Sequence, residues 1–348
     1  MTSDNQIMQT VIESLNSALK TALEKDEHVL ILGEDILDPY GGAFKVTRGL
    51  STSFPDQVLT TPVSEAGIVG VASGLALRGF RPVVEIMFGD FVTLAADQLI
   101  NHAAKFRYMY NDQVHVPIVI RTPMGGRRGY GPTHSQTMEK LFMGVPDISI
   151  FAPNLFIDPG ELLLASIFDV DDPVLFVENK IQYTQKLVID DDLQEFIKIN
   201  HQTSEIKETI RDFASPIQLS LRDAPSPSVT LATYGFMADL CRQAALRLAY
   251  VEEIFIDLII FSQLLPIDIS PINSSLQKTG RLLVIEEGTV TSGWGAEILA
   301  SSLEQYGNHH IRAMRVASKD SPIPAAHVLE QALLPGIEDI ILAVKKMV

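Results

Sequence analysis

The chain has 348 residues, of which 46% are hydrophobic and 20% are charged, a composition typical of compact enzymes rather than of disordered or fibrous proteins. Its formal net charge of −16 disfavours nucleic acid and anionic membranes as partners, because both surfaces would repel it. A basic protein partner is compatible with this charge, although acidity that only maintains solubility is the commoner explanation.

Length and cysteine content indicate domain number and compartment. A chain of this length exceeds one typical domain, so about two domains are expected. Cys241 is the only cysteine, which excludes an intrachain disulfide and a cluster of thiolate ligands and fits a reducing compartment. Residues 1–6 contain no signal-peptide pattern, and the most apolar stretch, 254–261, is too short to cross a bilayer. We therefore expect a cytoplasmic protein.

Helices and short apolar strands alternate along the first half of the chain. Apolar residues from 7 to 23 recur at the spacing of one helical face, which predicts the first helix. Strands that are apolar throughout and separated by helices indicate a parallel sheet covered on both faces, with ligands at the carboxyl ends of the strands. The predicted strands are 29–32, 82–86, 117–120, 148–151 and 174–177, and the predicted helices are about 64–78, 91–106 and part of 158–168.

The composition changes between about 181 and 228. Three consecutive aspartates, scattered lysines and glutamates, and a Pro/Ser run at 224–228 predict a connector with some helix that ends in a hinge. A second α/β unit follows, with predicted strands at 229–232, 254–256, 282–285 and 311–314 and helices near 237–248 and 294–303. The chain is therefore expected to comprise a domain at 1–180, a connector at 181–228 and a domain at 229–348.

Three segments contain the candidate functional residues. Thr61-Pro62-Val63-Ser64-Glu65 precedes a glycine-spaced apolar helix, whose glycines predict close packing. Together with Met87-Phe88-Gly89-Asp90-Phe91 and Pro132-Thr133-His134-Ser135-Gln136, this pattern resembles the beta chain of the thiamine-diphosphate-dependent decarboxylase component of 2-oxo acid dehydrogenase complexes. The resemblance covers nearly the whole chain. It implies a parallel-sheet pyrimidine-binding domain followed by a transketolase C-terminal-type α/β domain.

The resemblance also implies roles for individual residues. Thiamine diphosphate loses a proton from its thiazolium carbon to its own aminopyrimidine once a carboxylic acid hydrogen-bonds the pyrimidine ring, and by resemblance Glu65 is this acid. Phe91 is expected to offer the aromatic face on which the pyrimidine lies, with Met87 and Val63 as the adjacent wall. His134 is expected to face the substrate and to assist decarboxylation or acyl transfer.

Each of these residues also has an ordinary structural explanation. Ser64 can cap the helix while Glu65 complements its dipole. A Met and a Phe at the spacing of Met87 and Phe91 are usually core residues, and a lone loop histidine such as His134 is usually incidental. The three segments together favour the functional interpretation.

The partners and the metal are implied by what the sequence lacks. In this family a Gly-Asp-Gly segment, followed by an Asn some two dozen residues later, holds the diphosphate through a divalent metal, and no such pair occurs here. No metal ligand is therefore predicted in this chain. The resemblance implies an alpha subunit whose residues mainly bind the Mg²⁺. It also implies an assembly of two alpha and two beta chains, with a lipoyl acyltransferase core as a possible further partner.

The expected function is oxidative decarboxylation of a 2-oxo acid with acyl transfer to lipoamide, in an active site shared with the alpha subunit. One alternative is a split transketolase-type or acyl-transferring enzyme of specialised metabolism, and another is a non-catalytic scaffold chain. The chain departs from the family pattern at Arg127, Arg128 and Tyr130. The two arginines are either cations that hold a carboxylate or phosphate of a substrate or partner, or solvated arginines on a turn.

Overall fold

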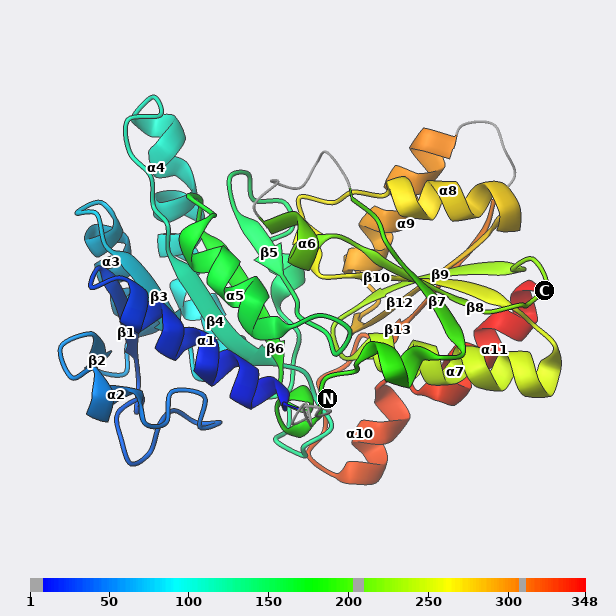
Figure 1. Ribbon diagram of the computed structural model, residues 1–348, viewed down its shortest axis with the longest axis horizontal. Helices are drawn as coiled ribbons and strands as arrows, with labels where there is room; N and C mark the ends of the chain where they lie inside the picture. Colours follow the sequence, from blue (N-terminus) through cyan, green and yellow to red (C-terminus); the bar gives the residue numbers. More distant parts are fainter. Residues whose placement is uncertain (1–8, 203–209, 307–310) are drawn as a thin grey trace, which may run out of the picture.

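The computed structural model describes residues 9–202, 210–306 and 311–348. These residues form two α/β units, each built on one β-sheet, that lie side by side along the long axis of the molecule (Figure 1). Strands β1 to β6 of the first sheet run parallel, as predicted, and β11 pairs antiparallel with β5. The strand order of this sheet is β11 (Gln263–Leu265), β5 (Ser149–Phe151), β6 (Val174–Asn179), β4 (Val119–Met124), β3 (Arg81–Glu85), β1 (Val29–Gly33) and β2 (Val58–Thr60).

The second sheet is mixed. Its first four strands run parallel, and the last two, β8 and β7, add antiparallel pairings at one edge. The strand order is β13 (Arg312–Ser318), β12 (Arg281–Thr289), β9 (Val229–Tyr234), β10 (Ile256–Phe261), β8 (Ile217–Leu221) and β7 (Phe196–Asn200).

Helices cover both faces of the first sheet. Val29 and Ile31 of β1 pack in one core cluster with α1 (Val11–Lys25) and α5 (Pro159–Phe168), whereas Leu30 and Leu32 pack in another with α3 (Glu65–Ala76). This alternation follows from the two-residue period of a strand and explains why the strand is apolar throughout. The remaining short elements of this unit are α2 (Leu50–Ser53), η1 (Gly89–Ala95), η2 (Gln98–Ala103), α4 (Ala104–Met109), η3 (Glu139–Leu141) and η4 (Gln182–Thr184).

The second sheet is covered in the same way. One face packs against α7 and α11, and the other against α8 and α9. The helices of this unit are α7 (Met237–Glu252), α8 (Ser270–Thr279), α9 (Trp294–Tyr306), α10 (His327–Leu333) and α11 (Ile337–Met347), and η5 (Asp190–Leu193) and α6 (Arg211–Ala214) lie in the preceding segment. No helix in the described parts of the chain is both long and apolar enough to cross a membrane.

Three expectations from the sequence need correction. The first helix begins at Val11, because Thr10 caps it: Thr10 N–H donates to Glu13 Oε2 at 2.8 Å, and Thr10 Oγ1 accepts from Glu13 N–H at 3.4 Å. Ile7, which was expected within this helix, lies outside the described residues. The helix expected at 91–106 is instead a succession of 3₁₀, π and α turns, namely η1, η2 and α4.

The segment expected to be a connector contains two strands, β7 and β8, of the second sheet. The polar residues within these strands concealed them, because a strand with antiparallel neighbours can leave one face exposed and so does not read as an apolar run. In β7, Phe196 is buried while Ile197 and Ile199 are about two-fifths exposed, at 42% and 43%.

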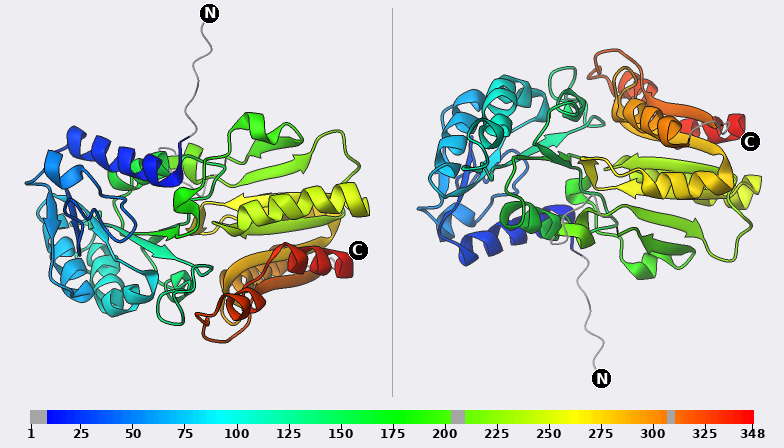
Figure 2. Two further views of the ribbon diagram at one scale, coloured as in Figure 1. Left: turned by 90° about the horizontal axis from the view of Figure 1, so that it is seen from below. Right: turned by 90° about the horizontal axis from the view of Figure 1, so that it is seen from above.

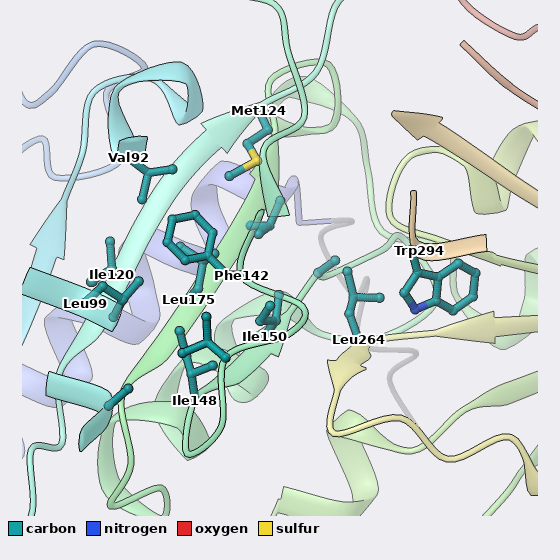
Figure 3. Packing of buried hydrophobic residues seen from close by; sticks show 14 of the residues in the cluster. Val92, Leu99, Ile120, Met124, Phe142, Ile148, Ile150, Leu175, Leu264 and Trp294 are labelled. Carbon is teal, nitrogen blue, oxygen red and sulfur yellow. The ribbon is translucent and has the colours of Figure 1, made fainter. Parts of the chain in front are cut away.

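A continuous hydrophobic cluster joins the two units. Val92, Phe142 and Leu175 of the first unit belong to the same cluster of buried residues as Trp294 of α9, with Leu264 of β11 between them (Figure 3). β11 lies in the sequence between two elements of the second unit, yet pairs with β5 of the first sheet. Views from below and above also show the two units side by side (Figure 2). The relative position of the two sheets is therefore determined by packing.

Candidate active site

The predicted site residues gather at one edge of the first sheet. β4, β3, β1 and β2 are neighbours and parallel, so the loops that follow them emerge side by side at the same edge. Glu34 follows β1, Glu65 begins α3 after β2, Phe91 lies in η1 after β3, and His134 lies in the loop after β4.

Glu65 is a buried carboxylate at the start of a helix. Only 7% of its surface is exposed, and within the described chain its carboxylate accepts no hydrogen bond. Ser64 caps the same helix by accepting a hydrogen bond from Gly67 N–H at 3.3 Å, so the cap does not depend on Glu65. The carboxylate is therefore available to a donor from outside the chain.

A second carboxylate, Glu34, lies near Glu65. Burial raises the pKa of Glu34, and the negative charge of Glu65 raises it further, while a hydrogen bond from Ser64 N–H opposes the rise. Glu34 Oε1 is buried without a hydrogen-bond partner in the described chain. Two close carboxylates in a partly desolvated site can share a proton.

Aromatic rings lie beside His134. The centroid of the His134 ring lies 4.7 Å from that of the Phe88 ring and 5.1 Å from that of the Phe91 ring. Both ring pairs are nearly edge to face. Phe91 and Met87 are half-buried, whereas Val63 is 82% exposed. The structure thus brings Phe91 and His134 into contact and leaves Val63 on the open side of the site.

Hydrogen bonds hold His134 from two directions. Its Nδ1 is 2.9 Å from Thr133 Oγ1, and its backbone carbonyl accepts a hydrogen bond from Lys180 Nζ at 2.8 Å. Lys180 follows β6 and is fully buried. Burial lowers the pKa of Lys180 to about 8, an effect that the negative charges of Asp90 and Glu287 oppose. Gln136 Nε2 donates to Asp90 Oδ1 at 3.0 Å and thereby joins the same loop to η1.

The two arginines of this loop make separate contacts, and Arg127 is partly buried whereas Arg128 is exposed. Arg127 has a 20% exposed side chain, and its Nη2 donates to the carbonyl of Pro335, in the second unit, at 2.7 Å. Arg128 donates through Nη2 to the carbonyl of Lys180 at 3.0 Å. The two side chains therefore point to different parts of the protein.

The sequence did not point to Glu34, Phe88 or Lys180. Glu34 and Lys180 each come directly after a strand of the parallel sheet, which was the available signal. The glycines of α3 also differ from expectation. A Cβ atom at Gly74 would meet nothing within 4 Å, and one at Gly70 would make only an ordinary contact with Gln98. Gly70 and Gly74 therefore do not serve close packing within the part of the chain that the structure describes.

Taken together, this edge of the sheet presents a buried acid that has no hydrogen-bond partner among the described residues, aromatic surfaces and an imidazole. A carboxylic acid can hold the nitrogen of a heteroaromatic ring, aromatic side chains can orient that ring, and an imidazole can exchange a proton with a bound substrate.

Comparisons with known proteins agree with this arrangement. The sequence matches the family model described as "Transketolase, pyrimidine binding domain" over residues 8–186 and the one described as "Transketolase, C-terminal domain" over residues 220–340. The pyruvate dehydrogenase E1 component subunit beta-1 of Arabidopsis thaliana is 36% identical over 339 residues, which cover 97% of this chain and 88% of that protein. The 2-oxoisovalerate dehydrogenase subunit beta of Pseudomonas aeruginosa is also 36% identical, and the match covers 94% of this chain and 91% of that protein.

A solved structure described as "Split gene transketolase, inactive beta4 tetramer" superimposes with a TM-score of 0.72 over 97% of both chains. At 19% identity this likeness shows the fold alone. The identities to the two dehydrogenase subunits, by contrast, extend over nearly the full length of this chain. The chain therefore belongs to the family of beta subunits of pyruvate and 2-oxoisovalerate dehydrogenases, built from transketolase-type pyrimidine-binding and C-terminal domains.

Proposed function

We propose that this chain is the beta half of a thiamine-diphosphate-dependent enzyme that oxidatively decarboxylates a 2-oxo acid and transfers the acyl group to lipoamide. The observation that carries the proposal is Glu65, a buried carboxylate without a hydrogen-bond partner in the described chain, at the same sheet edge as Phe91 and His134. The names of the relatives, pyruvate and 2-oxoisovalerate dehydrogenase subunits, support 2-oxo acids as the substrate class.

The residues present fit the pyrimidine half of the cofactor. When bound, thiamine diphosphate supplies an electron sink for the bond that breaks as a 2-oxo acid loses carbon dioxide. Glu65 would hold a proton at the pyrimidine ring nitrogen, and Phe91 would orient that ring, with Met87 and Val63 beside it. His134 would hold or transfer a proton at the oxygen of the substrate.

We further propose that an alpha subunit completes the site and holds Mg²⁺ with the diphosphate, in an assembly of two alpha and two beta chains. Its contact surface would include the exposed face of α3, where Val71 is 58% exposed beside Gly70 and Gly74. A lipoyl acyltransferase core of basic character would dock to this acidic chain. The compartment proposed is the cytoplasm, which suits the single buried cysteine.

The test is an assay of the chain assembled with a candidate alpha subunit from the same organism. A panel of 2-oxo acids is supplied with an artificial electron acceptor, and acyl transfer to lipoamide is measured separately. Turnover of a 2-oxo acid that depends on both chains and on thiamine diphosphate supports the proposal. Transfer to an aldehyde, without oxidation and without acylated lipoamide, would instead identify a transketolase-type enzyme.

A further inference from the structure

The loop that carries His134 is held in place by the second α/β unit. Three backbone N–H groups at the start of this loop donate to two carboxylates of that unit. Gly126 N–H donates to Glu287 Oε1 at 2.7 Å. Arg127 N–H donates to Glu330 Oε1 at 2.7 Å and Gly129 N–H to Glu330 Oε2 at 3.1 Å.

Both carboxylates are buried. Glu330, on α10, has no exposed surface, and Glu287, on β12, has 6%. Hydrogen bonds from backbone amides to a buried carboxylate are stronger than neutral ones, and a buried charge left without partners is costly. The two glutamates are therefore suited to fix the position of a loop that has no regular secondary structure. Figure 2 shows α10 beside the loop that follows β4.

The side chain of Arg127 also contacts the second unit. Its Nε lies 3.5 Å from Glu287 Oε2, its Nη2 bonds the carbonyl of Pro335, and its guanidinium carbon lies 5.0 Å from the centre of the Phe236 ring. Arg127 itself has a φ of +70°, a left-handed conformation that non-glycine residues seldom adopt. Its side-chain contacts and its N–H bond to Glu330 hold it there.

The neighbouring glycines show that the contact is close. A Cβ atom at Gly126 would lie 2.6 Å from Leu334 Cδ1. One at Gly129 would lie 3.1 Å from the carbonyl oxygen of Ala325, and φ at Gly129 is +68°. The second unit thus contacts the backbone of the loop directly, five to eight residues before His134.

We propose that Arg127, Glu287 and Glu330 form an interdomain latch that positions His134 for reaction with the substrate. The latch fixes the start of the loop, while Lys180 holds its end through the carbonyl of His134. These are positioning residues, which act through His134. The inference rests on the proposed role of His134 and adds that residues of the second unit determine the rate of the step in which His134 takes part.

The test uses Arg127→Met, Glu330→Gln and the milder Arg127→Lys, each in the full chain and in the assembled enzyme. A Gln at 330 can accept from only one of the two N–H groups through its oxygen, and a Met at 127 keeps an unbranched apolar stem but lacks the charged guanidinium group. Glu338→Gln is the matched control, because Glu338 is a 76% exposed carboxylate in the same unit whose partner is Arg247.

Three measurements are made. Hydrogen–deuterium exchange of peptides that cover 125–131 reports whether the backbone N–H groups of the latch remain hydrogen-bonded. The ¹⁵N chemical shifts of the His134 ring, assigned against His134→Ala, report its position and its bond to Thr133. Steady-state kinetics of the assembled enzyme separate kcat from KM and from cofactor affinity.

We expect Arg127→Met and Glu330→Gln to increase exchange at least tenfold, to move the His134 ring signals and to lower kcat about tenfold, with cofactor affinity within twofold of the unmodified enzyme. Arg127→Lys should recover most of the loss, and Glu338→Gln should change nothing. Unchanged His134 signals in a folded variant whose loop exchanges faster would overturn the inference. If His134→Ala turns over normally, the proposed role of His134 fails, whereas the latch is still judged by exchange and ring signals.

Discussion

At the scale of single residues, substitution of Glu65 should lower turnover without affecting the fold. Glu65→Gln should leave folding intact, because the carboxylate accepts no hydrogen bond within the described chain and Ser64 caps α3. Turnover of the assembled enzyme should fall by about 10²- to 10⁴-fold, the usual contribution of a positioned acid or base. The direct measurement is exchange of the proton on the thiazolium carbon, followed by NMR after acid quench.

Glu24→Gln is the control, since Glu24 is an exposed residue of α1 that forms a surface ion pair with Lys20. Normal proton exchange in an assembled Glu65→Gln enzyme would leave Glu65 with no role beyond the helix terminus.

Glu286 should make the stability of the chain depend on pH. Burial raises its pKa to about 7 from the ordinary 4.5, and the negative charge of Glu139 adds to the rise, while the hydrogen bond from Gly295 N–H opposes it. Between pH 4.5 and 7 the folded chain holds a proton that the unfolded chain has released, so the free energy of unfolding falls as pH rises through this window and levels off above it.

Glu286→Gln keeps an oxygen for Gly295 N–H and cannot ionise. It should raise the free energy of unfolding at pH 8 by up to about 3 kcal/mol, and much less at pH 4.5. Denaturant unfolding of the full chain between pH 4.5 and 8 measures this difference, with the exposed Glu338→Gln as control. Parallel pH profiles for the unmodified chain and Glu286→Gln would show that Glu286 does not titrate in this window.

At the scale of elements, α3 presents a face that the described residues do not cover. Gly74 has open space where a side chain would stand, so Gly74→Leu should not disturb the fold and should stabilise the isolated chain by about 0.5 to 1 kcal/mol, as expected when glycine leaves a helix. The same side chain should weaken association with the alpha subunit at least tenfold, because it would protrude from the proposed contact surface. Analytical ultracentrifugation of the mixed chains measures this.

Gly144→Leu serves as the control for a bulky residue at an exposed glycine with open space around it. Undiminished assembly of Gly74→Leu would exclude this face of α3 from the interface.

The elements that sequence periodicity predicts best are those buried on both faces. β1, β3, β4 and β6 read as apolar runs because helices cover them on either side, and they appear where expected. The irregular helix at η1 and η2 could not be foreseen, because apolar spacing does not distinguish 3₁₀, π and α turns. β11 was hidden for another reason: its pairing with β5 depends on contact between the two units, which no local pattern records.

The same limit applies to the site. Glu65, Phe91 and His134 could be named because their segments follow predicted strands and match a known family pattern. The contacts of Arg127 with Glu287 and Pro335 could not, since they join residues 160 or more positions apart in sequence. Long-range polar contacts of this kind depend on how the two sheets are placed relative to each other.

At the scale of the whole molecule, the proposed site at the sheet edge would hold only the pyrimidine half of the cofactor. The sequence contains no Gly-Asp-Gly segment with a following Asn, so under the proposed function the diphosphate and its metal would be held by ligands from the alpha subunit. We expect calorimetry to find no tight, magnesium-dependent binding of thiamine diphosphate by the isolated chain, and at least a hundredfold gain in affinity when the alpha subunit is added.

Glu65→Gln in the assembled enzyme is the informative companion, because it should keep magnesium-dependent binding while losing turnover. If the isolated chain binds thiamine diphosphate weakly and the assembly shows no turnover, the chosen alpha subunit is the wrong partner. Tight binding by the isolated chain in the presence of magnesium would contradict the division of the site between two chains. The alpha subunit would then be needed for some later step, such as presenting the acyl acceptor, and the exposed face of α3 would require a different explanation.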